Sequence, residues 1–236
     1  MLKRAINGIK RRVETRLQKL ILEAVFKRGP YDYVGLAYLK AGMEAADFFV
    51  EHMALAEDLK NKADLLKFAA SRVQNQGLWL EFGVFQGRDI RVLSGYTEGK
   101  LYGFDSFEGL PEDWTFFQRK GRFSLSERLP EVPGNVELVK GWFEDTLPAF
   151  LDEHPEPIAF LHIDSDLYSS AKYVLSEVAD RLVPGTVILF DDFLNYPDWK
   201  DGEAKAFFEI VEEVGKNYEY IGFSSKQQAV ALQFLE

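Results

Sequence analysis

Residues 78–83 read LWLEFG, an apolar run that ends in an acid and a glycine, and residues 100–105, KLYGFD, repeat this pattern. Strands that are buried on both faces read as continuous apolar runs, so these two segments predict neighbouring strands of a parallel sheet. Three later runs have the same texture: NVELVKG (135–141), IAFLHID (158–164) and TVILFDD (186–192). Helices are predicted between or after them, at 87–95, 143–153, 169–182 and 202–215. This alternation indicates an α/β fold.

The end of the chain departs from that alternation. YEYIGF (218–223) and QAVALQF (228–234) are joined by a short link, so we expect these two strands to pair antiparallel. The fold class predicted for residues 76–236 is therefore α/β, with a Rossmann-like sheet of seven mostly parallel strands and an antiparallel C-terminal hairpin.

Residues 1–75 are predicted to form a helical N-terminal extension. Apolar residues recur at helical spacing through residues 2–28, the opposite face is basic, and Gly29-Pro30 ends the helix. A second helical stretch covers residues 41–75. Three interpretations of the first helix stay open: packing on the body or on a partner in a homodimer, contact with an anionic surface, or a mobile arm.

Composition limits the chemistry. The chain has no cysteine and three histidines, which excludes disulfides, a thiol nucleophile and Cys-ligated zinc. Any metal would be held by oxygen atoms, which favours a hard cation such as Mg²⁺. The net charge of −10 argues against nucleic acid as the main partner. Because there is neither a bilayer-length apolar run nor a signal peptide, we expect a cytoplasmic protein without a transmembrane segment.

Carboxylates follow the ends of the predicted strands. In an open parallel sheet, ligands bind beyond the carboxyl ends of the strands. Carboxylates gathered there repel one another and are costly to desolvate, so such a site indicates a cation or hydroxyl groups as its ligands. The residues concerned are Glu81, Asp105, Asp164, Asp191 and Asp192.

The turn from Glu81 to Gly87, E-x-G-x-x-x-G, is a candidate cofactor-binding turn. Gly83 permits close backbone approach, and the start of the following helix favours an anion. The spacing is not the G-x-G-x-x-G of dinucleotide enzymes. Phe85 would crowd a pyrophosphate, so a smaller anion such as a carboxylate fits better. A plain glycine turn is the alternative.

Two further positions suit a nucleoside. Asp105 lies 24 residues after Glu81, about where an acid binds the ribose hydroxyls in such folds. A helix-capping role is the alternative for Asp105. Gly141 and Trp142, after the third strand, offer an apolar surface suited to adenine, although Trp142 could equally belong to the core.

Asp164, Asp191 and Asp192 follow adjacent predicted strands. Three carboxylates there would hold a divalent metal and leave positions open for water and substrate oxygens. Independent, solvated loop acids are the alternative.

Five segments resemble the macrocin O-methyltransferase family of class I S-adenosylmethionine-dependent methyltransferases. They are EFGVFQGR (81–88), YGFDSFEGLPEDW (102–114), KGWFEDTLP (140–148), HIDSDLYSSA (162–171) and LVPGTVILFDDF (182–193). The resemblance implies Mg²⁺-dependent transfer of a methyl group from S-adenosylmethionine to a hydroxyl of a sugar or another natural product. It implies metal ligands at Asp164, Asp191 and Asp192.

The same resemblance implies contacts with the cofactor. Those positions are Glu81, Gly83, Asp105, Ser106 and Trp142. The residues of the turn and strand ends add Phe85, Gly87, Gly141 and Asp164 to the predicted cofactor site.

The metal arrangement also resembles catechol O-methyltransferase, which has a catalytic lysine three residues after the first metal aspartate. That position is Leu167 here, so the base does not carry over. Asp166 is the nearest candidate for the general base, and Asp192 is the other predicted catalytic residue. His162 is either a base or a buried histidine.

Residues 107–131 contain Trp114, Phe116, Phe117 and Phe123, which suits either an aromatic lid over the site or a packed loop. The acceptor is expected to be a small hydroxylated molecule of unknown identity. Two other functions stay open: a nicotinamide-dependent dehydrogenase, against which the glycine spacing speaks, and a non-catalytic scaffold that keeps the cofactor fold.

Overall fold

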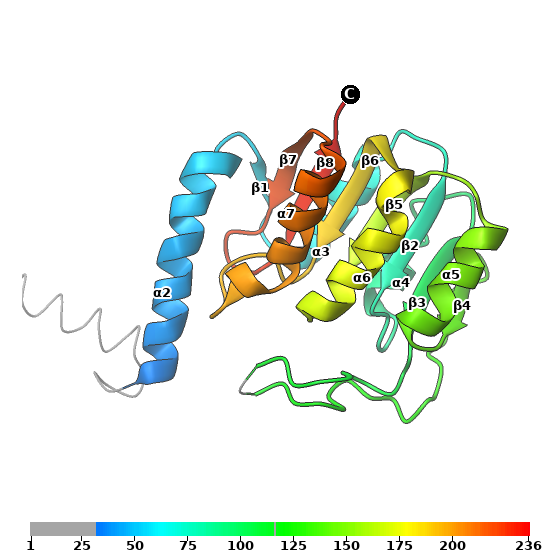
Figure 1. Cartoon of the computed structure of the whole chain (residues 1–236), viewed down its shortest axis with the longest axis horizontal. Coiled ribbons are helices and arrows are strands. Elements are labelled where there is room, and N and C mark those ends of the chain that lie inside the picture. The colour runs from blue at the N-terminus through cyan, green and yellow to red at the C-terminus, as the bar shows by residue number, and fades with distance from the viewer. Residues whose placement is uncertain (1–31, 116) are drawn as a thin grey trace, which may run out of the picture.

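A single sheet forms the centre of the computed structural model, which describes residues 32–115 and 117–236. Within these residues the sheet has eight strands in the order β1-β7-β8-β6-β5-β2-β3-β4 (Figure 1). Neighbours run parallel except β8, which is antiparallel to both β6 and β7. The strands are β1 (Glu57–Asp58), β2 (Leu78–Phe82), β3 (Leu101–Asp105), β4 (Val136–Lys140), β5 (Ile158–Ile163), β6 (Leu182–Phe190), β7 (Tyr218–Phe223) and β8 (Val230–Phe234).

Helices cover both faces of the sheet (Figure 1). On one face, α5 (Phe143–Glu153), α6 (Tyr168–Val178) and α7 (Glu203–Val214) share a buried cluster with Leu80 and Phe82 of β2. On the other face, α3 (Lys62–Arg72) and α4 (Arg88–Leu93) pack with Trp79. Consecutive residues of one strand therefore belong to opposite cores, which explains the unbroken apolar runs. Two short 3₁₀ turns, η2 (Ala179–Arg181) and η3 (Trp199–Asp201), complete this part of the chain.

The predicted fold class is confirmed: the sheet is mostly parallel and ends in an antiparallel hairpin. One strand was not predicted. The two-residue β1 pairs in parallel with β7, with Glu57 opposite Gly222, and adds an eighth strand at the edge. An isolated pair such as Glu57-Asp58 has no apolar alternation that could mark it in the sequence.

The helix predicted over residues 41–75 is interrupted. A longer helix, α2 (Tyr33–Phe48), continues as a π-helical turn, η1 (Phe49–Met53), and α3 begins only at Lys62. The side chain of Asn61 accepts the N–H of Asp64 (3.0 Å) and caps the new helix. The apolar face of α3 is buried on the sheet. The division of the chain into two regions at residue 75 stays a prediction.

The helix predicted over residues 2–28 lies outside the described residues. Within the described part of the chain, the search for a helix of bilayer length and sufficient apolarity found none.

Phe48 joins α2 to the body of the protein. Its ring lies 5.6–6.5 Å, between centroids, from the rings of four residues on other elements: Phe193, Trp199, Phe208 and Tyr220. Aromatic pairs at such distances stabilise beyond the area that they bury. The C-terminal end of α2 is thereby fastened to the face of the sheet that carries α7.

Replacement of Phe48 by alanine removes this joint. We expect Phe48→Ala to lower the free energy of unfolding by about 3 kcal/mol, because a ring with several aromatic neighbours leaves a cavity. Val50→Ala is the matched control, since Val50 is 71% exposed in the same segment and should change stability by less than about 0.5 kcal/mol. Denaturant unfolding measures the stability of both variants, and an equal loss in the two would contradict the role of Phe48 in joining α2 to the body.

Candidate active site

The carboxyl ends of the central strands open onto a cleft of about 2050 Å³. Its walls come from α2, the start of α3, the strand-end turns and the loop after β3. All but one of the predicted site residues line it, the exception being Gly87. Those that line it are Glu81, Gly83, Phe85, Asp105, Ser106, Gly141, Trp142, Asp164, Asp166, Asp191 and Asp192.

Gly83 lets two strand ends approach closely. Its φ is +96°, and a Cβ atom built there would lie 1.8 Å from the carbonyl oxygen of Asp164. No L-residue with a side chain fits that space. Gly87 serves the same turn differently: it has φ +72° and precedes α4, where it lies beside Arg91 and Pro130.

Asp105 binds the backbone of the neighbouring turns. Its Oδ2 accepts the N–H groups of Val84 (2.9 Å) and Phe85 (2.7 Å), and its Oδ1 accepts that of Phe107 (2.6 Å). Burial raises the pKa of Asp105 although these three donors lower it. The turn amides that the sequence suggested for an anion are thus already bonded. A carboxylate has about four acceptor positions, so one is left for a hydroxyl group.

Three carboxylates converge, and two of them, Asp166 and Asp192, have no ion pair in the described part of the chain. One oxygen each from Asp164, Asp166 and Asp192 lie within 4.8 Å of one another. Burial and Asp164 raise the pKa of Asp166, and burial, Asp191 and Asp166 raise that of Asp192, in both cases well above the ordinary value. Across residues 32–115 and 117–236, no lysine or arginine forms an ion pair with Asp166 or Asp192.

Asp166 also has an unusual backbone, with φ +63°. A non-glycine residue in the left-handed region is uncommon and costs roughly 1–3 kcal/mol unless local bonds compensate, and such residues gather at functional sites.

Asp191, the third metal ligand predicted from the sequence, faces a lysine. Lys62 Nζ lies 2.7 Å from Asp191 Oδ1, 3.0 Å from Asp164 Oδ2 and 2.8 Å from Asp89 Oδ2. Burial would lower the pKa of Lys62, but Asp164, Asp191 and Asp89 raise it well above its ordinary value. Burial raises the pKa of Asp191 to about 7 against the effect of this ammonium.

Glu81 and His162 form a buried pair on adjacent strands, where they lie side by side in the β2–β5 register. Glu81 Oε2 is 3.6 Å from His162 Nδ1, and neither atom has a hydrogen-bond partner among the residues described. Burial raises the pKa of Glu81 to about 7. Burial favours neutral His162, yet Glu81 raises the pKa of this imidazole. His162 is fully buried, as its non-catalytic alternative requires.

Glu203 is a site residue that the sequence did not reveal. It is fully buried in the first turn of α7, where Oε1 accepts the N–H (3.0 Å) and Oγ (3.2 Å) of Ser165 and Oε2 accepts the N–H of Asp192 (3.3 Å). Burial and Asp192 raise its pKa. Glu203 therefore holds together the two loops that carry the acids, and only its position at a helix start could have signalled it.

The loop after β3 runs beyond the carboxyl ends of the strands (Figure 1). Trp114, Phe117 and Phe123 of this loop line the cleft, while Phe116 lies outside the described residues. The Trp114 ring lies 5.7 Å from that of Tyr196, between centroids. Glu112 of the same loop accepts a hydrogen bond from the hydroxyl of Ser169 in α6 (2.6 Å). These contacts agree with a covering loop.

Comparison with known proteins finds methyltransferases. A family described as "Methyltransferase domain" matches residues 80–193. The 8-demethyl-8-(2,3-dimethoxy-alpha-L-rhamnosyl)-tetracenomycin-C 4'-O-methyltransferase of Streptomyces olivaceus is 29% identical over 159 residues. The match covers 56% of this chain and 60% of that enzyme, so less than two thirds of the relative is represented.

Two solved structures share the fold. Calicheamicin methyltransferase CalS11 superposes with a TM-score of 0.60 at 22% identity, over 90% of this chain and 96% of the other. An O-methyltransferase from Bacillus cereus in complex with SAH has a TM-score of 0.50 at 18% identity, over 92% and 96%. The described chain thus has the Rossmann-like fold of methyltransferases.

The buried acids predict an unusual pH dependence in the metal-free protein. A carboxyl whose pKa is raised by folding stabilises the fold while protonated, and this contribution is lost as the pH rises through the folded pKa. With Glu81 and Asp191 near 7, and His162 shifted in the same direction, we expect the unfolding free energy in EDTA to fall by at least about 2 kcal/mol between pH 5.5 and 8.

Denaturant unfolding at the two pH values measures this change. Excess Mg²⁺ at pH 8 should restore most of the loss, because a cation favours the ionised acids. Greater stability at pH 8 than at pH 5.5 in EDTA would contradict the electrostatic account.

Proposed function

We propose that this chain transfers a methyl group from S-adenosylmethionine to a hydroxyl of a small molecule, as an enzyme of the macrocin O-methyltransferase type that uses a divalent cation. The observation that carries the proposal is the group of Asp164, Asp166 and Asp192 in the cleft, in which Asp164 pairs with Lys62 while Asp166 and Asp192 have no ion pair within the described residues. The methyltransferase match over residues 80–193 contains these three residues and supports the same reading.

The cleft fits the parts of the proposed cofactor. Glu81 lines it, so its carboxyl group would be a suitable partner for the ammonium group of an amino acid. Asp105 has one acceptor position left for a ribose hydroxyl, with Ser106 beside it. Gly141 and half-buried Trp142 give the apolar wall for adenine. The SAH bound by the similar Bacillus cereus enzyme agrees with this assignment.

A hard divalent cation such as Mg²⁺ fits the carboxylates at the rim. Lys62 engages one oxygen of Asp164 and one of Asp191 and leaves the second oxygen of each available, while Asp192 has no cationic partner among the described side chains. Asp164, Asp191 and Asp192 would hold the ion. The chemistry that it would supply is a lower pKa for the acceptor hydroxyl.

Asp166 is the proposed general base. Its buried carboxylate, with a pKa raised by burial and Asp164, is suited to accept the proton of the acceptor hydroxyl. Glu203 accepts the backbone N–H of Ser165, the residue before it, and that of Asp192 on the neighbouring loop. Bound S-adenosylmethionine supplies an electrophilic methyl group, so the residues need chiefly to orient the acceptor, remove one proton and exclude water. The loop with Trp114 would close the cleft over the acceptor.

A sugar hydroxyl is the proposed acceptor class. The relative from Streptomyces olivaceus is named for methylation of a rhamnosyl-bearing natural product, and the cleft offers both carboxylates and aromatic walls. Homodimerisation through residues 2–28 and a cytoplasmic location stay predictions.

The dehydrogenase alternative has one feature in its favour, a Tyr-x-x-x-Lys spacing at Tyr168 and Lys172. In the structure both side chains bind Glu209: the Tyr168 hydroxyl donates to its carboxylate (2.8 Å) and Lys172 Nζ lies 3.2 Å away. The spacing therefore serves the contact between α6 and α7.

Cofactor class is decided by calorimetry. We expect the full chain to bind S-adenosylhomocysteine and to give no heat with NAD. Asp105→Asn should weaken S-adenosylhomocysteine binding at least about tenfold, because an amide nitrogen cannot accept the hydrogen bonds that hold the turn and the ribose. Binding of NAD alone would overturn the proposal.

The base assignment is tested with Asp166→Asn. Asparagine tolerates the left-handed backbone of this position, so the loop should persist while kcat for methyl transfer falls about 10²- to 10⁴-fold. Asp152→Asn is the control, because Asp152 is exposed on α5. Turnover is followed by mass spectrometry of the methylated acceptor, with S-adenosylhomocysteine affinity measured in parallel. An Asp166→Asn enzyme with undiminished kcat would remove this base from the mechanism.

A further inference from the structure

Lys62 occupies an unusual position for a lysine. It is the first residue of α3, yet its ammonium lies among carboxylates from three other segments of the chain. Asp89 belongs to α4, Asp164 follows β5 and Asp191 follows β6, and all three are within 3.0 Å of Nζ. The side chain of Lys62 is 24% exposed. A single ammonium therefore stands where three negative groups meet.

The surrounding backbone holds these groups in place. The N–H of Asp164 donates to the carbonyl of Phe82 (2.9 Å), and that of Asp191 donates to the carbonyl of Ile163 (2.9 Å). The N–H of Lys62 itself donates to the side chain of Gln227. The backbones of Lys62, Asp164 and Asp191 are therefore held by hydrogen bonds that do not involve the contacts between the three side chains.

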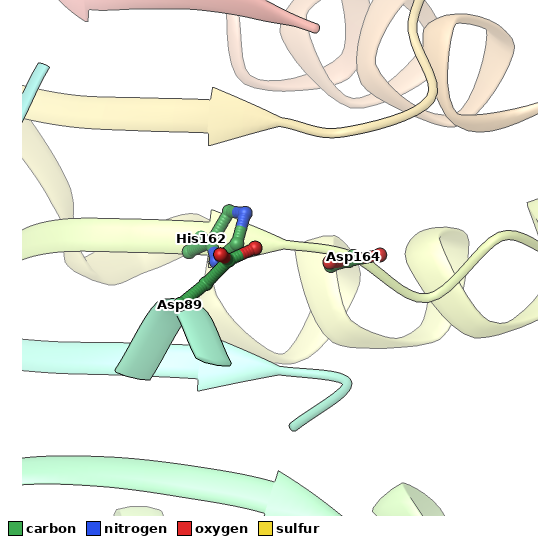
Figure 2. A group of neighbouring side chains, drawn as sticks. All are labelled: Asp89, His162 and Asp164. Carbon is green, nitrogen blue, oxygen red and sulfur yellow. The ribbon is translucent and has the colours of Figure 1, made fainter. Parts of the chain in front are cut away.

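A histidine completes this cluster. Figure 2 shows the side chains of Asp89, His162 and Asp164 near the end of β5, and one ligand atom from each of the three residues lies within 4.8 Å of the others. His162 is fully buried, and both of its ring nitrogens have no hydrogen-bond partner among the described residues. Two carboxylates and an unpartnered imidazole are a ligand set that divalent transition metals accept.

The acidic rim thus contains two groups of candidate metal ligands that share Asp164. One consists of Asp164 with Asp166 and Asp192, and the divalent ion proposed above, with Asp164, Asp191 and Asp192 as its ligands, belongs to that side of the rim. The other consists of Asp89, His162 and Asp164 and already faces an ammonium. Two divalent ions side by side would repel each other strongly, whereas one divalent ion and one ammonium carry less charge.

We propose that Lys62 is a positioning residue whose ammonium fills the second cation site and thereby limits the rim to a single divalent ion. The inference rests on the proposed function only for the identity of the first ion. Surrounded by three carboxylates, the lysine remains an ammonium, so it orients Asp164 and Asp191 and takes no proton from the acceptor.

The test counts Mn²⁺ ions bound per full-length chain by equilibrium dialysis, with electron paramagnetic resonance to distinguish one ion from a coupled pair. Lys62→Met keeps the length of the side chain but removes its charge, and we expect one more bound Mn²⁺ than in the wild type. Lys62→Arg keeps the charge and should give the wild-type count. In Lys62→Met with Asp89→Asn, the added ion should disappear.

An unchanged count in Lys62→Met would overturn the proposal, and so would an added ion in Lys62→Arg. Should Lys62→Met unfold without metal, Lys62→Gln is the second uncharged variant. If Mn²⁺ restores the folded state of at least one of these two variants, with one more bound ion than in the wild type, the proposal is supported. If Mn²⁺ restores neither variant, the proposal is overturned.

This experiment is separable from the proposed function. A wild-type chain that binds no Mn²⁺ would remove the divalent ion from the proposed reaction, while the difference between Lys62→Met and the wild type would still decide the role of Lys62. Absence of methyl transfer together with the expected difference in ion count would refute the proposed function and leave the role of Lys62 standing.

Discussion

Carboxylates that lie close together at the carboxyl ends of the strands repel one another, and this repulsion decides which groups can surround them. Parallel strands bring Asp164, Asp191 and Asp192 to the same place, and burial raises the pKa of Asp191 and of Asp192. Several kinds of group in the protein offset this repulsion. Backbone N–H groups bind Asp105 and Glu203, and the ammonium of Lys62 binds part of the remainder. What is left uncompensated is the part that opens into the cleft.

The sequence was most informative where chemistry is local. The strand ends and their acids follow directly from apolar runs, and Gly83 follows from the tight turn that it permits, here imposed by the carbonyl of Asp164. The predicted Asp166 also lies in the cleft. These features are written in neighbouring residues, so a pattern of a few positions is enough to find them.

The parts that escaped prediction depend on contacts far apart in the chain. Lys62 precedes Asp164 by 102 positions, and Glu203 reaches Ser165 across 38. Neither has a neighbour in sequence that marks it, since a lysine and a glutamate at the start of helices are ordinary surface residues. The hydrogen bonds from backbone N–H groups to Asp105 could not be predicted for a related reason: the sequence shows an acid at a strand end but not which groups already bind it.

The Phe48 joint has a consequence for how the cleft can change. The outer wall on the α2 side includes Tyr38 and Ala41, whereas the side proposed to bind the nucleoside is built from strand ends and their turns. One wall is a helix fastened to the core near its final residue, and the other belongs to the core itself. Under the proposed function, substitutions along this helix would reshape the acceptor side of the cleft and leave the proposed cofactor side unchanged, which makes the helix the natural place to engineer acceptor specificity.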